Sequence, residues 1–206
     1  MLNYLKLFKE LIIKFLKSYF TSYKPLSKSK MEWDLEYKSL KWNYLENLEE
    51  IGRNSLIVSI LSRLPKGFDI LDLGCGQGTL FKLSQHLNFN RYIGIDISEI
   101  AIELANKIND ERAKFICMDL TKYIPEQRFD IIIFNEVLYY TDDPLKVVKM
   151  FRNFLKNEGI ILISMWNNKQ RNNKIWKLLK KNFNVKLEYI IKENRSRRSW
   201  IIKAIS

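Results

Sequence analysis

Short apolar runs alternate with segments of helical spacing beyond residue 64. Five of these runs have few polar interruptions, as is typical of parallel strands that helices cover on both faces; they lie at residues 68–73, 91–96, 114–119, 129–134 and 159–165. The alternation of strand, helix and strand predicts an α/β fold with a mostly parallel sheet, whose ligand binds at the carboxyl ends of the strands. Two more strand-like runs at 185–192 and 199–205 flank a turn-like segment and predict an antiparallel hairpin, which brings the sheet to seven strands.

The region before the first predicted strand has the spacing of helices. Residues 2–23 predict a helix with a wide apolar face opposite a row of lysines. An aromatic-rich segment at 33–48 and an aliphatic segment at 56–64 predict two further helices. We therefore expect an N-terminal helical cap over residues 1–64 and a ligand-binding domain over residues 65–206.

A cluster of glycines follows the first predicted strand. Gly74, Gly76 and Gly78 are separated by single residues, and Asp72 lies two residues before the first of them. Glycines in such a turn let a ligand lie against the main chain, and helical spacing from Thr79 onward places the turn at a helix N-terminus. A dinucleotide-binding fingerprint needs Gly-x-Gly-x-x-Gly, so the spacing here differs from it.

This arrangement of Asp72 and the three glycines resembles motif I of the class I S-adenosylmethionine-dependent methyltransferases. The resemblance covers about residues 30–206, including the C-terminal hairpin, which dinucleotide dehydrogenases lack. It implies a Rossmann-like fold, S-adenosylmethionine as the cofactor, and a glycine loop beneath the amino-acid portion of that cofactor, with Asp72 near its ammonium group.

A second carboxylate fits the same cofactor. Asp96 lies 18 residues after Gly78, close to the offset of about 20 residues at which nucleotide-binding folds place the carboxylate that accepts from the ribose hydroxyls. The resemblance also implies that Asp119, followed by Leu120, faces the adenine. The residues predicted to bind the cofactor are Asp72, Gly74, Cys75, Gly76, Gly78, Asp96, Ile97, Asp119, Leu120 and Asn135.

The segment at residues 135–140 bears on the methyl acceptor. It reads Asn-Glu-Val-Leu-Tyr-Tyr and lacks the prolines of the motif that is typical of enzymes methylating the amines of nucleic-acid bases. The string resembles nodulation-protein-S-like N-methyltransferases, which act on an amino sugar, and so favours a small or saccharide acceptor methylated at nitrogen or oxygen. Methyl transfer depends mainly on positioning. Glu136 as a base and Tyr139 as a pocket wall are the predicted catalytic residues, whereas the single histidine, His86, falls outside the expected pocket.

The net charge of +12 is concentrated at the two ends of the chain. Residues 1–30 contain seven cations and one acid, and residues 152–206 contain fourteen cations and three acids. This distribution leaves two alternatives open: an RNA methyltransferase that uses the basic ends, or a non-catalytic cofactor-binding or membrane-associated protein that docks through residues 2–23. A lysine-rich composition accounts equally well for the charge. The oligomeric state stays open.

Composition indicates a cytoplasmic protein. No apolar run approaches the roughly 20 residues that span a bilayer, and lysines interrupt the N-terminal stretch too often for a signal peptide. Cys75 and Cys117 lie at or beside predicted strand ends, which suits reduced thiols better than a disulfide or a metal site.

Overall fold

The protein is described by a computed structural model, which covers residues 25–26, 28–168, 172–195 and 197–206. The predicted helix at residues 2–23 lies outside this part of the chain. Among the described helices, none is long and apolar enough to cross a membrane.

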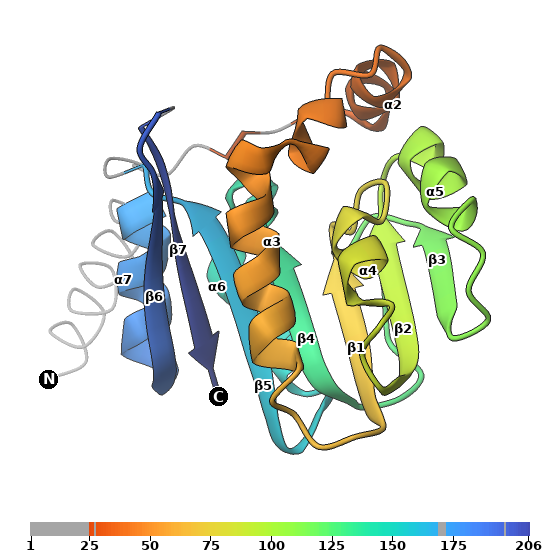
Figure 1. Ribbon diagram of the computed structural model, residues 1–206. Coiled ribbons are helices and arrows are strands. Elements are labelled where there is room, and N and C mark those ends of the chain that lie inside the picture. Colours follow the sequence, from red (N-terminus) through yellow and green to blue (C-terminus); the bar gives the residue numbers. More distant parts are fainter. Residues whose placement is uncertain (1–24, 27, 169–171, 196) are drawn as a thin grey trace, which may run out of the picture.

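A seven-stranded sheet forms the centre of the molecule, with the strand order β3-β2-β1-β4-β5-β7-β6 (Figure 1). The first five strands in this order run parallel, whereas β7 pairs antiparallel with both β5 and β6. The predicted fold class, with its C-terminal antiparallel hairpin, is thereby confirmed. The strands are β1 (Phe68–Leu73), β2 (Phe89–Asp96), β3 (Ala113–Cys117), β4 (Phe129–Asn135), β5 (Leu155–Trp166), β6 (Val185–Glu193) and β7 (Arg198–Ile205).

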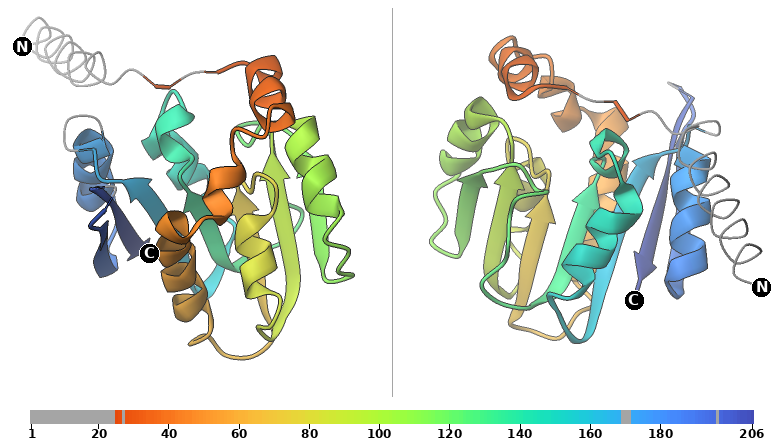
Figure 2. Two further views of the ribbon diagram at one scale, coloured as in Figure 1. Left: turned by 45° about the horizontal axis from the view of Figure 1, so that its top comes forward. Right: turned by 180° about the vertical axis from the view of Figure 1, so that it is seen from behind.

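Helices cover both faces of the sheet (Figures 1 and 2). The side chains of α6 and α7 pack into one apolar cluster, and those of α3 and α4 pack into a second cluster on the other face. Because α3 shares the core of the sheet, the described part of the N-terminal cap is packed against the domain that follows it. The helices are α2 (Lys30–Lys38), α3 (Leu48–Leu61), α4 (Thr79–Ser84), α5 (Glu99–Asn106), α6 (Pro144–Arg152) and α7 (Asn172–Asn182), with short 3-10 helices η1 (Asn43–Glu46) and η2 (Leu138–Tyr140).

Polar residues define where several helices begin. The hydroxyl of Ser98 accepts from the Ala101 amide at the start of α5. Asp143 caps α6, whose first residue is Pro144. Ser29 starts α2 with a capping box that includes Glu32. These caps place α2, α5 and α6 at the same edge of the sheet, where the parallel strands end.

The prediction of one helical segment over residues 33–48 was wrong. Helix α2 ends at Lys38, and Leu40 adopts a left-handed backbone conformation with φ of 59°. The chain then turns through residues 39–47 and forms only η1. The aromatic side chains that suggested a continuing helix, Trp42 and Tyr44, instead line a cavity at the edge of the sheet. Their spacing places them along the wall of this cavity and not along one face of a helix.

Candidate functional site

A cavity of about 640 Å³ opens at the carboxyl ends of the parallel strands. Its walls come from the ends of the strands and from α2, η1 and α3, which precede β1 in the chain. All the residues predicted to bind a cofactor line it except Gly78, and the predicted catalytic residues Glu136 and Tyr139 line it as well. The exposed His86 is not among the lining residues, in agreement with the sequence analysis.

The glycine turn after β1 leaves no room for side chains. Gly74 has φ of 78°, and a Cβ there would lie 2.6 Å from Cγ2 of Val137. Gly76 has φ of 56°, and its Cβ would lie 2.7 Å from the hydroxyl oxygen of Tyr37. Gly78, also at positive φ, is the N-cap of α4. The turn therefore presents bare backbone to the cavity, as the sequence predicted.

Asp72 is a buried carboxylate that lacks a cationic hydrogen-bond partner. Its side chain is 1% exposed, and Oδ2 accepts a hydrogen bond of 2.5 Å from the hydroxyl of Tyr92. Oδ1 has no hydrogen-bond partner among the described residues. Burial raises the pKa of Asp72 to about 7, while the Tyr92 hydrogen bond opposes that rise. The lone pairs of Oδ1 can accept a hydrogen bond from a donor on a ligand.

Asp96 connects the end of β2 to the glycine turn. One carboxylate oxygen accepts from the Gly76 amide at 2.9 Å, and the other accepts from the Ser98 amide at 2.9 Å. Burial raises the pKa of Asp96, and these backbone donors counteract it. Each oxygen retains a lone pair, so the carboxylate remains able to accept from a pair of hydroxyls.

The remaining predicted cofactor residues lie along the same wall. Asp119 accepts hydrogen bonds of 2.8 Å from the amide and the hydroxyl of Thr121, and Leu120 packs against the core while it lines the cavity. Ile97 lies beside Asp96. Cys75 is buried, and burial raises the pKa of its thiol well above the usual range, so the thiol stays protonated.

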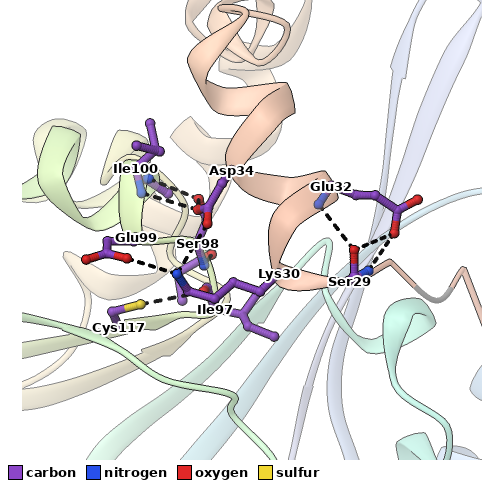
Figure 3. A network of polar contacts seen from close by, with 11 residues as sticks. Ser29, Lys30, Glu32, Asp34, Ile97, Ser98, Glu99, Ile100 and Cys117 are labelled. Carbon is purple, nitrogen blue, oxygen red and sulfur yellow. Dashed lines mark hydrogen bonds and ion pairs between the residues drawn. The ribbon is translucent and has the colours of Figure 1, made fainter.

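Helix α2 is fastened over the end of β2 (Figure 3). Oδ1 of Asp34 accepts from the Ser98 hydroxyl at 2.7 Å and from the Ile100 amide at 3.4 Å. Lys30 bridges Asp34 at 3.2 Å and Glu99 at 2.9 Å. Since the Ser98 amide also donates to Asp96, one chain of hydrogen bonds runs from α2 to the glycine turn.

Aromatic side chains form the wall of the cavity contributed by α2 and the turn after it. Trp33 packs against Trp42 at 5.5 Å between ring centroids and edge-on against Tyr140 at 4.8 Å. Trp42 in turn lies 5.9 Å from Tyr44. The ammonium group of Lys28 lies 4.4 Å from the centroid of the Trp33 ring. This wall suits a ligand with a flat or ring-shaped face.

Glu136 turns back from the end of β4 in a left-handed conformation with φ of 61°. Its carboxylate accepts from the Tyr139 hydroxyl at 2.9 Å, the Ser164 hydroxyl at 3.0 Å and the Trp166 amide at 3.0 Å. Burial raises the pKa of Glu136 and raises that of Tyr139 well above its usual range. These contacts fix the segment after β4 to the end of β5. The catalytic roles of Glu136 and Tyr139 stay predictions.

Sequence reasoning missed a polar cluster on α3. Arg53 is 3% exposed; it donates to Oδ1 of Asn135, and its guanidinium lies 3.4 Å from the carboxylate of Glu50. In the part of the chain that the structure describes, its Nε has no hydrogen-bond partner. Glu50 also pairs with Arg198 of β7 at 2.7 Å, and Asn135 donates to Asn54 at 3.1 Å. Polar residues at positions i, i+3 and i+4 of an apolar helix were the available signal, because that spacing puts them on one face.

Comparisons with known proteins agree with this geometry. A family model described as "Methyltransferase domain" matches residues 64–202. The ribosomal protein L11 methyltransferase of Caldicellulosiruptor saccharolyticus is 33% identical over 101 residues, which cover 48% of this chain and 32% of that protein. The chain thus spans about a third of the length of this relative.

Two solved structures share the fold at low identity. The N-methyltransferase NodS from Bradyrhizobium japonicum WM9, in complex with S-adenosyl-L-homocysteine, aligns with a TM-score of 0.70 at 16% identity, covering 80% of this chain and 90% of that one. The plantazolicin methyltransferase BpumL, in complex with a desmethylPZN analogue and the same cofactor product, aligns with a TM-score of 0.69 at 18% identity, covering 94% and 98%.

The geometry of the glycine turn predicts a position-specific effect on stability. Gly74→Ala should lower the free energy of unfolding by about 2–5 kcal/mol, because a left-handed alanine is strained and its Cβ collides with Val137. Gly52→Ala is the matched control: its Cβ would meet nothing closer than 3.8 Å in the exposed middle of α3, so it should stabilise by about 0.5–1 kcal/mol. Urea denaturation measures the free energy of unfolding of both variants. Equal changes in the two would contradict the steric requirement for glycine at position 74.

Proposed function

Because the chain belongs to the methyltransferase domain family, we propose that it transfers a methyl group from S-adenosylmethionine to a small or saccharide acceptor, at nitrogen or oxygen. The observation that carries the proposal is a single cavity that joins the glycine turn and three acids on one side to an aromatic wall on the other. A donor and an acceptor bound there share one enclosed space.

The predicted membership in the class I S-adenosylmethionine-dependent methyltransferases is confirmed by the family match and by the shared fold. The identity of the acceptor is a separate matter. The matched relatives are named for a ribosomal protein and for plantazolicin among others, so the proposed acceptor rests on the cavity and on the segment at residues 135–140.

The buried polar atoms that find no hydrogen-bond partner within the described ranges of the chain fit the amino-acid end of the cofactor. Oδ1 of Asp72 is an acceptor for its ammonium group, and Nε of Arg53 is a donor for its carboxylate. The hydroxyl of Thr79, also without a partner, lies at the start of α4 beside the same turn. Asp96 would accept from the ribose hydroxyls, and Asp119 with Leu120 would face the adenine.

When bound, the cofactor supplies an electrophilic methyl group. The chain contributes binding, orientation and exclusion of water. The cavity wall formed by Trp33, Trp42 and Tyr140 positions the ring face of the acceptor, and α2 closes the cofactor side. Glu136 and Tyr139 hold the end of β4 against β5. This contact fixes the position of Asn135, and of Arg53 bonded to it, beside the cofactor.

The acceptor can be identified by transfer of a labelled methyl from S-adenosylmethionine into extract of the source cells, separated into RNA, lipid and small-saccharide pools. We expect label in the saccharide or lipid-linked pool. Asp96→Ala should weaken cofactor binding about 10- to 150-fold through lost charged hydrogen bonds, whereas Glu103→Ala, which removes an exposed carboxylate of α5, should not. Label in RNA would overturn the proposed acceptor, and an unchanged affinity in Asp96→Ala would overturn the ribose assignment.

Cofactor binding should depend on pH through Asp72. The carboxylate must be ionised to hold an ammonium group, and its pKa is raised to about 7 by burial. Affinity for S-adenosylmethionine should therefore rise with pH through that value, by about tenfold per unit on the acidic side. Calorimetric titration across the range measures the midpoint.

Tyr92→Phe tests the cause of this dependence. It removes the hydrogen bond that lowers the pKa of Asp72, so the midpoint should move to higher pH. Tyr92 lies in β2, and Tyr123→Phe, which removes a hydroxyl from the loop after β3, is the matched control. A pH-independent affinity, or the same midpoint in Tyr92→Phe and the wild type, would contradict the role of Asp72.

A further inference from the structure

The outer surfaces of α6 and α7 carry charge of one sign. Seven cationic residues lie on these two helices, and neither helix contains an aspartate or a glutamate. The helices contact each other on the same face of the sheet (Figure 2). The cations are Lys146, Lys149 and Arg152 on α6, and Lys174, Lys177, Lys180 and Lys181 on α7; all except Lys174 are exposed. We call this surface the α6–α7 face.

A lysine-rich composition does not explain this arrangement. Helices α3 and α4 pack on the other face of the sheet. Together with α5 they contain two cations and four acids. Composition alone would spread lysines over both faces. In the sequence, Lys146 and Lys149 of α6 fall within residues 64–151, which hold more acids than bases, and only Arg152 falls within the basic C-terminal residues. Only folding brings them beside those of α7.

We propose that the α6–α7 face docks on an anionic lipid surface. Clusters of four to eight basic residues bind acidic lipid headgroups, at about 1 kcal/mol per residue near the surface. Six of the seven cations here are lysines, which act as point charges and lack the forked geometry with which arginine recognises nucleic acid. The aromatic residues of the two helices, Phe151 and Trp176, are both buried, so the face offers no stacking platform for single-stranded nucleic acid.

The α6–α7 face begins beside the mouth of the cavity. Tyr140 and Asp142, just before α6, and Trp166, at the end of β5 before α7, line the cavity. The side chain of Trp166 is 48% exposed, and tryptophan favours the boundary between lipid and water. The acids Asp142 and Asp143 lie at this edge, where Asp143 caps α6. Docking would bring the mouth close to the lipid surface. That membrane-borne acceptors then reach the cavity rests on the proposed function, whereas docking itself does not.

Co-sedimentation of the full chain with vesicles tests the proposal. Wild type should bind vesicles of phosphatidylcholine mixed with phosphatidylglycerol, should not bind phosphatidylcholine alone, and should dissociate in high salt. The combined variant Lys146→Gln, Lys149→Gln, Lys177→Gln, Lys180→Gln should lose at least about tenfold in partitioning. The control carries the same change in net charge at exposed lysines of other elements: Lys66→Gln, Lys107→Gln, Lys114→Gln, Lys122→Gln. It should stay within about twofold of wild type.

Two further measurements separate the possible outcomes. Calorimetric binding of S-adenosylhomocysteine should be unchanged in both variants, which shows that they are folded and tests the cofactor site independently of docking. A third variant, Lys6→Gln, Lys9→Gln, Lys14→Gln, Lys17→Gln, tests the N-terminal segment. The proposal is overturned if the wild type does not bind anionic vesicles, or if the control variant loses as much binding as the α6–α7 variant. It is also overturned if only the N-terminal variant loses binding, or if the face binds mixed-sequence RNA and not vesicles.

Discussion

The hydrogen bonds of the Asp96 carboxylate hold the cofactor side of the cavity together. One oxygen accepts from the glycine turn after β1, and the other accepts from Ser98 at the start of α5. The hydroxyl of Ser98 donates to Asp34 on α2. Three segments distant in sequence are thus positioned by one partly buried acid. Because the same acid is expected to receive the ribose hydroxyls, ligand binding and the closure of α2 over the site depend on a common group.

The other half of the site contains buried charged side chains. Asp72 and Arg53 are almost fully buried, and each has one polar atom to which no other described residue makes a hydrogen bond. Such atoms cost stability in the absence of a ligand. Their electrostatic interaction lowers the pKa of Asp72, but it does not supply the missing hydrogen bonds. A zwitterionic ligand end between them would supply a hydrogen bond to each of these atoms. The site therefore lowers the stability of the free protein and raises its affinity for the ligand.

The sequence predicted the elements whose signals are local. Apolar runs located the strands, and the glycine turn and Asp96 were recognised from their spacing. The contact between Arg53 and Asn135 joins residues 82 positions apart, and no local pattern in either segment predicts that they meet. The break at Leu40 was missed because cavity-lining aromatics imitate a helix face. The α6–α7 face was missed because block sums of charge do not reveal which helices become neighbours.

A crystal structure of the full chain with S-adenosylhomocysteine would locate both ends of the cofactor product in the cavity. We expect the ribose hydroxyls on Asp96, the ammonium group on Asp72 and the carboxylate on Arg53, with the sulfur facing the aromatic wall. A product molecule bound elsewhere, or one whose ribose and amino-acid ends avoid Asp96 and Asp72, would contradict this arrangement.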